Sequence, residues 1–261
     1  MYRAMKVISL AILFFITALL YASVGFGGGS TYTALLAISG AHYLIIPVIS
    51  LTCNILVVSG NSWRYYRAGL ISLKRVWPFL VFSVPLAWVG GRVPIPEQVF
   101  ISVLAISLLF AGFSLLFKGK PNEASNLRAN PFWASSIIGG MLGFLSGIVG
   151  IGGGIFLAPI LHLSNWGKAK EIAALCSLFI LVNSISGLGG QFIKLNNYGN
   201  LDMMGPYWLL IPAVIIGGFI GNRLSLKVFS ENTVRRLTAV LILFVAVRLL
   251  LKFYNLDLTW R

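Results

Sequence analysis

Two glycine-rich runs are the positions of this sequence best suited to hold a small anion. The first contains Gly25, Gly27, Gly28 and Gly29 followed by Ser30 and Thr31, and the second contains Gly150, Gly152, Gly153 and Gly154. Glycines have no Cβ, so their backbone N–H groups can approach a ligand closely. A helix that begins after such a run also points its positive end at that position. The runs therefore predict a substrate site, with hydroxyl donors after the first run only, because Ile155 and Phe156 follow the second.

Uncharged polar residues occur in the apolar segments that follow the two runs. Asn54 lies in the first of these segments, and Ser177 and Asn183 lie in the second. An unpaired polar group in hydrocarbon is costly, so each side chain needs a partner. That partner is either the transported ligand or a neighbouring helix, and the sequence favours neither. No Gly-Lys-Ser/Thr follows either run, which excludes a Walker phosphate loop.

The glycine runs interrupt two apolar stretches, residues 7–39 and 131–163, that are too long for one crossing. As continuous helices they would reach about 50 Å, compared with a hydrocarbon core of about 30 Å. Each glycine also disfavours helix by about 1 kcal/mol relative to alanine. We therefore predict a helix, a bend inside the protein and a short return arm. The alternative is that the glycines only allow helices to pack closely.

The order of the matched segments indicates two copies of one unit within a single membrane domain, residues 1–261. Gly25 to Gly29 matches Gly150 to Gly154, and Ser50, Ser59 and Gly60 match Ser177, Ser186 and Gly187. The first repeat spans residues 7–117, the linker 118–130 and the second repeat 131–253. Each copy has its broken stretch followed by three plain spans, which we place at 43–60, 76–90, 99–117, 172–190, 206–224 and 237–253.

Composition assigns the chain to the membrane. Of its 261 residues 58% are hydrophobic and 10% charged, and the mean hydropathy is +0.90, whereas soluble domains carry roughly 25% charged residues. The net charge of +14 lies mainly in short clusters between apolar segments, where it orients helices rather than binding nucleic acid. All acidic residues are expected in loops or the tail, which favours an anionic or neutral substrate over a cation.

No cofactor, metal site or catalytic residue is predicted. Cys53 and Cys176 lie inside apolar runs without metal-ligand spacing. A membrane-embedded enzyme is disfavoured, since no intramembrane His-acid pair or zinc ligand set is present.

The predicted fold class is an all-α polytopic membrane protein with two homologous halves in inverted orientation. Inversion gathers the basic residues of the internal loops on one face and leaves only Arg92 and Lys194 on the other. It also puts both termini outside. Arg3 and Lys6 at the N-terminus argue for the alternative, a parallel arrangement of the two halves.

The two glycine motifs resemble those of the TauE/SafE family of sulfite and organosulfonate exporters. The resemblance is carried by Ser23 to Gly29, by Gly143 to Gly154 with Pro159 following, and by the polar span Ala174 to Gly187. It implies a multi-pass permease of the cell membrane, the inner membrane in a bacterium, that exports small sulfur-containing or carboxylate anions.

We therefore expect a secondary transporter of small anions that works by alternating access. The alternative within transport is a passive channel for the same ions. The expected partners are the anionic substrate and the lipid bilayer, and a homodimer is left open.

Overall fold

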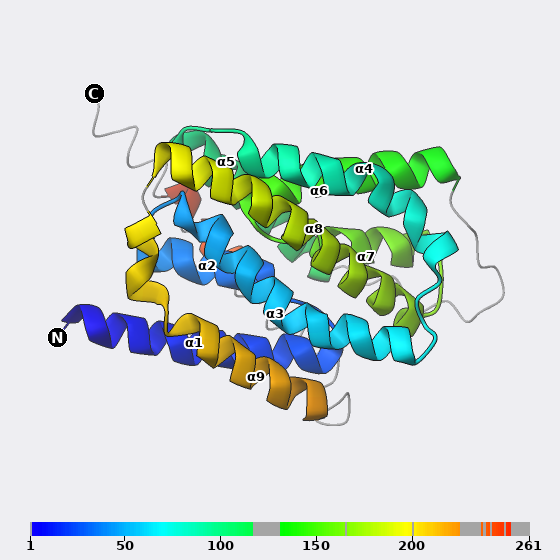
Figure 1. The fold of residues 1–261 in the computed structure, drawn as a ribbon, viewed down its shortest axis with the longest axis horizontal. Coiled ribbons are helices and arrows are strands. Elements are labelled where there is room, and N and C mark those ends of the chain that lie inside the picture. Colours follow the sequence, from blue (N-terminus) through cyan, green and yellow to red (C-terminus); the bar gives the residue numbers. More distant parts are fainter. Residues whose placement is uncertain are drawn as a thin grey trace.

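The computed structural model describes residues 2–116, 131–164, 166–199 and 201–224, followed by residues 236, 239, 240, 242–247 and 249–251 (Figure 1). Every regular element among them is helical. The first half contains α1 (Tyr2–Val24), α2 (Gly29–Ser39), α3 (Ile45–Arg67), α4 (Leu73–Arg92) and α5 (Glu97–Leu116). The second half contains α6 (Phe132–Val149), α7 (Gly154–Leu163), α8 (Ala169–Tyr198), the 3-10 helix η1 (Leu201–Tyr207) and α9 (Leu210–Leu224). The predicted linker, 118–130, lies outside the described residues.

Five of these helices are long and apolar enough to cross a membrane, namely α1, α3, α5, α6 and α8. Large apolar side chains cover their outer surface; Ile106, Trp133 and Met141 are each more than 60% exposed. Hydroxyl and amide side chains are buried inside instead. A polar interior beneath an apolar surface suits a lipid solvent, so the prediction of an all-α polytopic membrane protein is confirmed.

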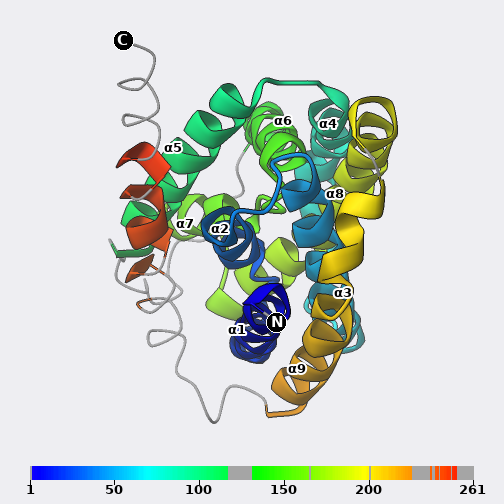
Figure 2. The same cartoon turned by 90° about the vertical axis from the view of Figure 1, so that its left-hand side faces the viewer.

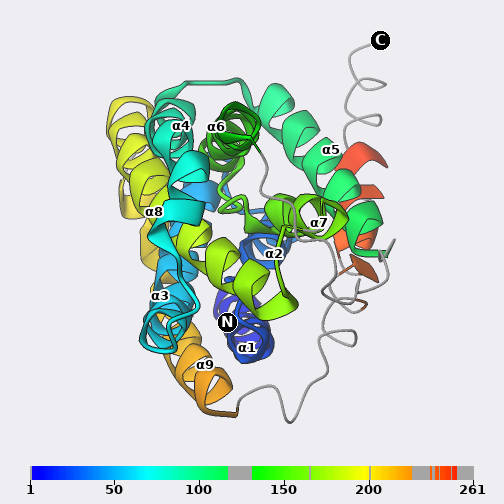
Figure 3. The same cartoon turned by 90° about the vertical axis from the view of Figure 1, so that its right-hand side faces the viewer.

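Both overlong apolar stretches are broken at their glycines, as predicted. α1 ends at Val24 and α2 begins at Gly29, while α6 ends at Val149 and α7 begins at Gly154. Seen end-on in Figures 2 and 3, the short arms α2 and α7 lie inside a ring formed by the longer helices. The first eight residues of α2 are all buried, which agrees with this central position.

The two halves interlock through close helix pairs that the sequence analysis did not predict. α6 packs along α4, and α9 packs along α1. At each of five α6 and α9 glycines, a Cβ would overlap with a carbonyl oxygen of the facing helix: Gly139 with Phe79, Gly143 with Ser83, Gly147 with Ala87, Gly217 with Phe15 and Gly221 with Leu19. Glycine at four-residue spacing lets backbones approach this closely in membranes.

The corresponding helices of the two halves run in opposite directions in Figure 1. α1 and α3 run from left to right, whereas α6 and α8 run from right to left. Three predicted boundaries are wrong. α3 continues to Arg67 instead of ending at residue 60, so Arg64 and Arg67 lie in a helix and not in a loop. The span expected to begin at Pro206 begins at Leu210, because Pro206 belongs to η1. α8 continues to Tyr198, so Lys194 lies inside a helix and not in a loop.

Candidate functional site

The first bend is closed by backbone hydrogen bonds and a clamp between the two helices it joins. The Phe26 N–H donates to the Tyr21 carbonyl at 2.9 Å. Gly25 and Gly28 have φ of 87° and 84°, a left-handed conformation that other residues rarely adopt. The Tyr21 hydroxyl and the Thr31 Oγ1 lie 2.9 Å apart, which fixes the end of α1 to the start of α2.

Asn54 of α3 contacts both glycine bends at once. Its Nδ2 donates to the Ile151 carbonyl of the second bend at 3.1 Å. A Cβ at Gly27 would lie 2.5 Å from its Oδ1, a Cβ at Gly152 would lie 2.7 Å from its Nδ2, and a Cβ at Gly29 would overlap with the same nitrogen. The absence of side chains at three glycines is therefore what makes room for this amide between the bends.

The backbones of the two bends also meet directly. A Cβ on Gly29 would overlap with the Ile151 carbonyl oxygen. On the other side of Gly29, its own carbonyl lies 2.8 Å from the Thr33 hydroxyl and 3.0 Å from the Ser50 hydroxyl. These two hydroxyls are 2.9 Å apart. The carbonyl and hydroxyl groups satisfy one another, which holds the first turn of α2 in place.

Several buried polar atoms beside the bends have no hydrogen-bond partner among the described residues. They include the Asn54 Oδ1, the Ser146 Oγ and the Ser184 Oγ, all on fully buried side chains. A Cβ at Gly152 would lie 3.2 Å from the Ser184 Oγ, and one at Gly153 would lie 3.5 Å from the Ser146 Cβ. Unpaired buried polar atoms are rare in native proteins and call for an explanation. A bound polar ligand at the bends supplies one.

The two return arms start at the bends with their positive ends uncompensated. Gly28 is the N-cap of α2 and Gly153 is the N-cap of α7, and neither end has a side-chain cap or an acidic residue in its first turn. The first N–H groups of a helix have no partner within it and favour an anion. Both helices are long enough, at 11 and 10 residues, to carry such an end. The chemistry of this site is therefore suited to negative charge.

The predicted site residues do not all meet at this position. Gly25, Gly150 and the remaining glycines form the bends themselves, and Ser30 is buried in the first turn of α2. The Ser177 hydroxyl instead lies 3.0 Å from that of Ser62, between α8 and α3. The Asn183 Nδ2 donates to the Phe179 carbonyl of its own helix at 2.8 Å. This hydrogen bond stays within α8 and does not connect Asn183 to a bend.

Three further residues near the bends were not predicted from the sequence. The buried Asn61 lies one heptad beyond Asn54 and approaches the Phe26 carbonyl at 3.5 Å. Gln191 donates from Nε2 to the carbonyls of Gly147 and Ile148, at 2.6 and 3.2 Å, just before the second bend. Tyr21 closes the first bend. Asn61 follows Asn54 by seven residues, and Gln191 follows Ser184 by seven. This spacing places each pair on one helix face and could have identified both residues.

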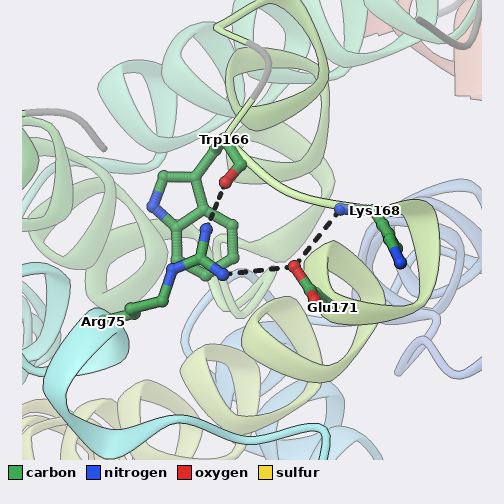
Figure 4. Close-up of polar contacts among 4 residues, drawn as sticks. All are labelled: Arg75, Trp166, Lys168 and Glu171. Atoms are coloured by element: carbon green, nitrogen blue, oxygen red, sulfur yellow. Dashed lines mark hydrogen bonds and ion pairs between the residues drawn. The ribbon is translucent and has the colours of Figure 1, made fainter. Parts of the chain in front are cut away.

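A separate polar cluster joins the halves at the connection between α7 and α8 (Figure 4). The Arg75 guanidinium lies 4.0 Å from the centre of the buried Trp166 ring, donates to the Trp166 carbonyl and pairs with Glu171 at 3.2 Å. The Glu171 carboxylate also accepts from the Lys168 N–H at 3.3 Å, which caps α8. We call these four residues the Arg75 cluster. It fastens the return arm α7 and the spanning helix α8 to the start of α4.

Interrupted helices that meet around a buried amide, in a bundle of apolar spans, define a polytopic membrane transport protein. The chain belongs to the sulfite exporter TauE/SafE family, whose model matches residues 10–249. It is 34% identical over 248 residues to the "Probable membrane transporter protein y4hK" of Sinorhizobium fredii, covering 94% of this chain and 98% of that one.

More distant relatives have the same type of name. The "Probable membrane transporter protein YunE" of Bacillus subtilis is 23% identical over 92% of this chain and 96% of its own length. The "Probable membrane transporter protein MJ0441" of Methanocaldococcus jannaschii is 24% identical over 89% and 90%. Comparison with solved structures gave no significant match. The family identifies this chain as a membrane transporter.

Proposed function

We propose that this transporter is a secondary carrier that moves a small anion across the cell membrane through a site at the two bends. The observation that carries the proposal is Asn54, one amide that contacts both bends. A ligand held there touches both halves at once. Its binding is then sensitive to any relative movement of the halves, which is what alternating access requires.

The preference for an anion follows from the charges around the site. Two uncompensated helix N-termini, those of α2 and α7, begin at the bends, and unpaired hydroxyls of Ser146 and Ser184 lie beside them. Among the described residues no acidic side chain is buried. A cation would meet two positive helix ends there without a carboxylate to offset them.

We further propose that the substrate is sulfite, an organosulfonate or a related carboxylate, and that transport is outward. This follows the family, whose description is that of a sulfite exporter. Each of these ions has several acceptor oxygens, which suits a site built from N–H and O–H donors. The unpaired Asn54 Oδ1 can accept from a protonated substrate oxygen or from a water that accompanies the ion.

The two halves are proposed to be inverted repeats in the inner membrane. The opposite directions of α1 and α6 and of α3 and α8 in Figure 1 support this arrangement. So does the exchange of packing partners, in which α4 packs on α6 as α9 packs on α1. Rocking of interlocked repeats around a central site can open it to either side in turn.

Counterflow in proteoliposomes tests the proposal. Vesicles containing the purified protein and loaded with sulfite, thiosulfate, sulfoacetate or small carboxylates should accumulate the labelled external anion. Trans-stimulation supports a carrier, whereas flux without it indicates the passive channel. Asn54→Leu should lower the flux at least about tenfold, the loss expected for a charge-assisted hydrogen bond, and Asn54→Asp should lower it further by repelling the anion.

Thr52→Val is the matched control for Asn54. The Thr52 hydroxyl lies on the same helix and donates to the Val48 carbonyl at 2.8 Å, away from the bends. Its flux should stay close to that of the wild type. Equal flux in the Asn54 and Thr52 variants would contradict a site between the bends.

A further inference from the structure

Lys194 is a cationic residue that the protein covers almost completely. It lies in α8, four residues before the end of that helix, and its side chain is only 3% exposed. Within the described part of the chain it makes no hydrogen bond or ion pair, and the ion pair found there joins Arg75 to Glu171 instead. Its Nζ is not among the fully buried unpaired atoms, so the ammonium group reaches the accessible surface. An ionisable residue inside a membrane segment usually marks a ligand path.

Lys194 lies at one end of a face of α8 that carries a polar residue every seventh position, with apolar residues between them. Ser177, Ser184 and Gln191 follow one another at seven-residue spacing, and Lys194 comes one turn after Gln191. Residues at such spacing lie on one face of a helix. All of them are buried, at 0 to 3% exposure. The face therefore leads from Ser184, beside Gly152 of the second bend, to Lys194.

Gln191 connects this face to the second bend. Its Nε2 donates to the carbonyls of Gly147 and Ile148 at the end of α6. Its Oε1 is buried without a partner among the described residues. Lys194 thus adjoins a side chain that touches the helix end from which the bend begins.

The corresponding position in the first half also carries a positive charge. When Ser50 is aligned with Ser177 and Gly60 with Gly187, Lys194 corresponds to Arg67, the last residue of α3. Arg67 is exposed and stacks over Trp63, with 5.2 Å from its Cζ to the ring centre. The aligned position therefore carries a cationic residue in both halves, which is exposed in the first half and almost completely covered in the second.

We infer that Lys194 is a second anion-binding residue, which receives the substrate between the site at the bends and the end of α8. This inference rests on the proposed function, because an ammonium group attracts the substrate only if the substrate is an anion. The exposed Arg92 ends α4 beside this part of α8, since a Cβ at Gly190 would lie 2.9 Å from the Arg92 backbone nitrogen. Its guanidinium stacks over Trp88, with 5.1 Å from the Cζ to the ring centre. Two described acidic residues lie near this end of α8. Glu97 is exposed and forms no ion pair with either cation, and Asp202 of η1 has an interaction of its own.

The alternative is a structural role, in which Lys194 packs its alkyl stem against the protein and extends its ammonium to water. A purely structural lysine would affect stability and protein yield but not the concentration dependence of flux. Substitution of Lys194 should therefore change the KM of transport only if Lys194 binds the anion.

The test compares Lys194→Gln, Lys194→Arg and Lys194→Met in full-length protein in proteoliposomes, with sulfite as the probe. Lys194→Gln and Lys194→Met should raise KM about tenfold, as expected for loss of a charge-assisted hydrogen bond. Lys194→Arg should restore KM to within about threefold of the wild type, because it keeps the charge but not the shape. Lys170→Gln is the control, since Lys170 is an exposed lysine on the same helix, and its KM should not change.

An unchanged KM in folded Lys194→Met, with active wild type, would overturn the inference and leave the proposed function standing. A KM raised equally in Lys194→Arg and Lys194→Met would also overturn it, because charge would then not be the cause. If wild-type protein transports no anion in any assay, the proposed function fails, and the inference fails with it. The methionine variant removes a buried charge without leaving a cavity, so it retains a fold in which KM can be measured.

Discussion

The two glycine bends share left-handed glycines at two equivalent positions, with Gly152 as a third in the second bend, and they differ in chemistry. In the first bend Ser30, Thr31 and Thr33 follow the glycines, and Thr31 and Thr33 are held by hydrogen bonds to Tyr21 and to the Gly29 carbonyl. In the second bend Ile155 and Phe156 take the equivalent places, and Phe156 packs in the hydrophobic core. Both bends use left-handed glycines, with φ of 84° at Gly28 and 75° at Gly153.

This difference separates two properties of a bend, its shape and its hydroxyl groups. The shape of the bend, set by glycine, is needed in both halves because the backbones meet at Gly29 and Ile151. Hydroxyl groups follow the glycines in one half only. We therefore expect changes of shape to be equally harmful in both bends, and changes of polarity to matter mainly in the first.

The largest effect is expected from changing the shape of either bend. Gly28→Val and Gly153→Val each force a β-branched residue into a left-handed conformation and should lower flux by about 100-fold, the order of loss that a misplacement of about 1 Å causes at a catalytic site. Counterflow normalised to the amount of folded protein measures the effect. Gly40→Val is the matched control, because Gly40 has a φ of 79° with nothing near its Cβ position. Normal flux in both bend variants would refute the site.

An intermediate effect is expected from removing a hydroxyl. Ser30→Ala takes away a buried hydroxyl at the start of α2 and should raise the KM for sulfite several-fold, up to about tenfold. Ile155→Val, at the equivalent position of the second bend, should leave KM unchanged, because it removes one methyl group and no donor. A similar rise in both variants would mean that the bends do not differ in binding the anion.

Crowding at the amide gives a second measure of shape. Gly27→Ala places a methyl group against the Asn54 Oδ1, at a distance of 2.5 Å before any relaxation. The amide can turn aside, so we expect a loss of flux smaller than that of the valine variants. Gly205→Ala in η1, where nothing lies within 4 Å of the new Cβ, is the control. Flux in the Gly27 variant as high as in this control would show that the amide need not keep its position.

The smallest effect is expected at the Arg75 cluster, which fastens only one of the two return arms. The connection from α2 to α3, its counterpart, has no ion pair among the described residues. The pair between Arg75 and Glu171 is about one-third exposed, so Arg75→Lys should reduce stability by no more than about 1 kcal/mol. Lysine keeps the charge but loses the ring stacking and the forked hydrogen bonds.

Thermal unfolding at low and high salt measures this loss. Lys74→Gln changes an exposed neighbour with no ion pair to Glu171 and should have no effect. A larger change of transport rate than of stability in Arg75→Lys would mean that the cluster takes part in the movement of the halves.

The sequence was enough to predict the membrane fold class and the breaks in both long stretches. Hydrophobicity and glycine content act locally, so they can be read without knowledge of the neighbours. The same holds for the hydroxyl groups that distinguish the first bend. The sequence alone did not predict that α4 packs on α6 and α9 on α1, although Gly139, Gly143 and Gly147 carry the four-residue spacing that permits it.

The position of each polar side chain was decided only by the tertiary structure. Asn54 and Asn183 are both amides in corresponding spans, but the residue aligned with Asn54 is Leu181, so Asn183 is displaced by two residues. Two residues are about 200° around a helix. Because of this rotation, Asn54 contacts both bends, whereas Asn183 donates only to the Phe179 carbonyl. The almost complete covering of Lys194 was decided in the same way, because α8 continues past the predicted end of its span. Composition determines which polar groups enter the membrane, whereas helix length, rotation and packing determine what each of them meets.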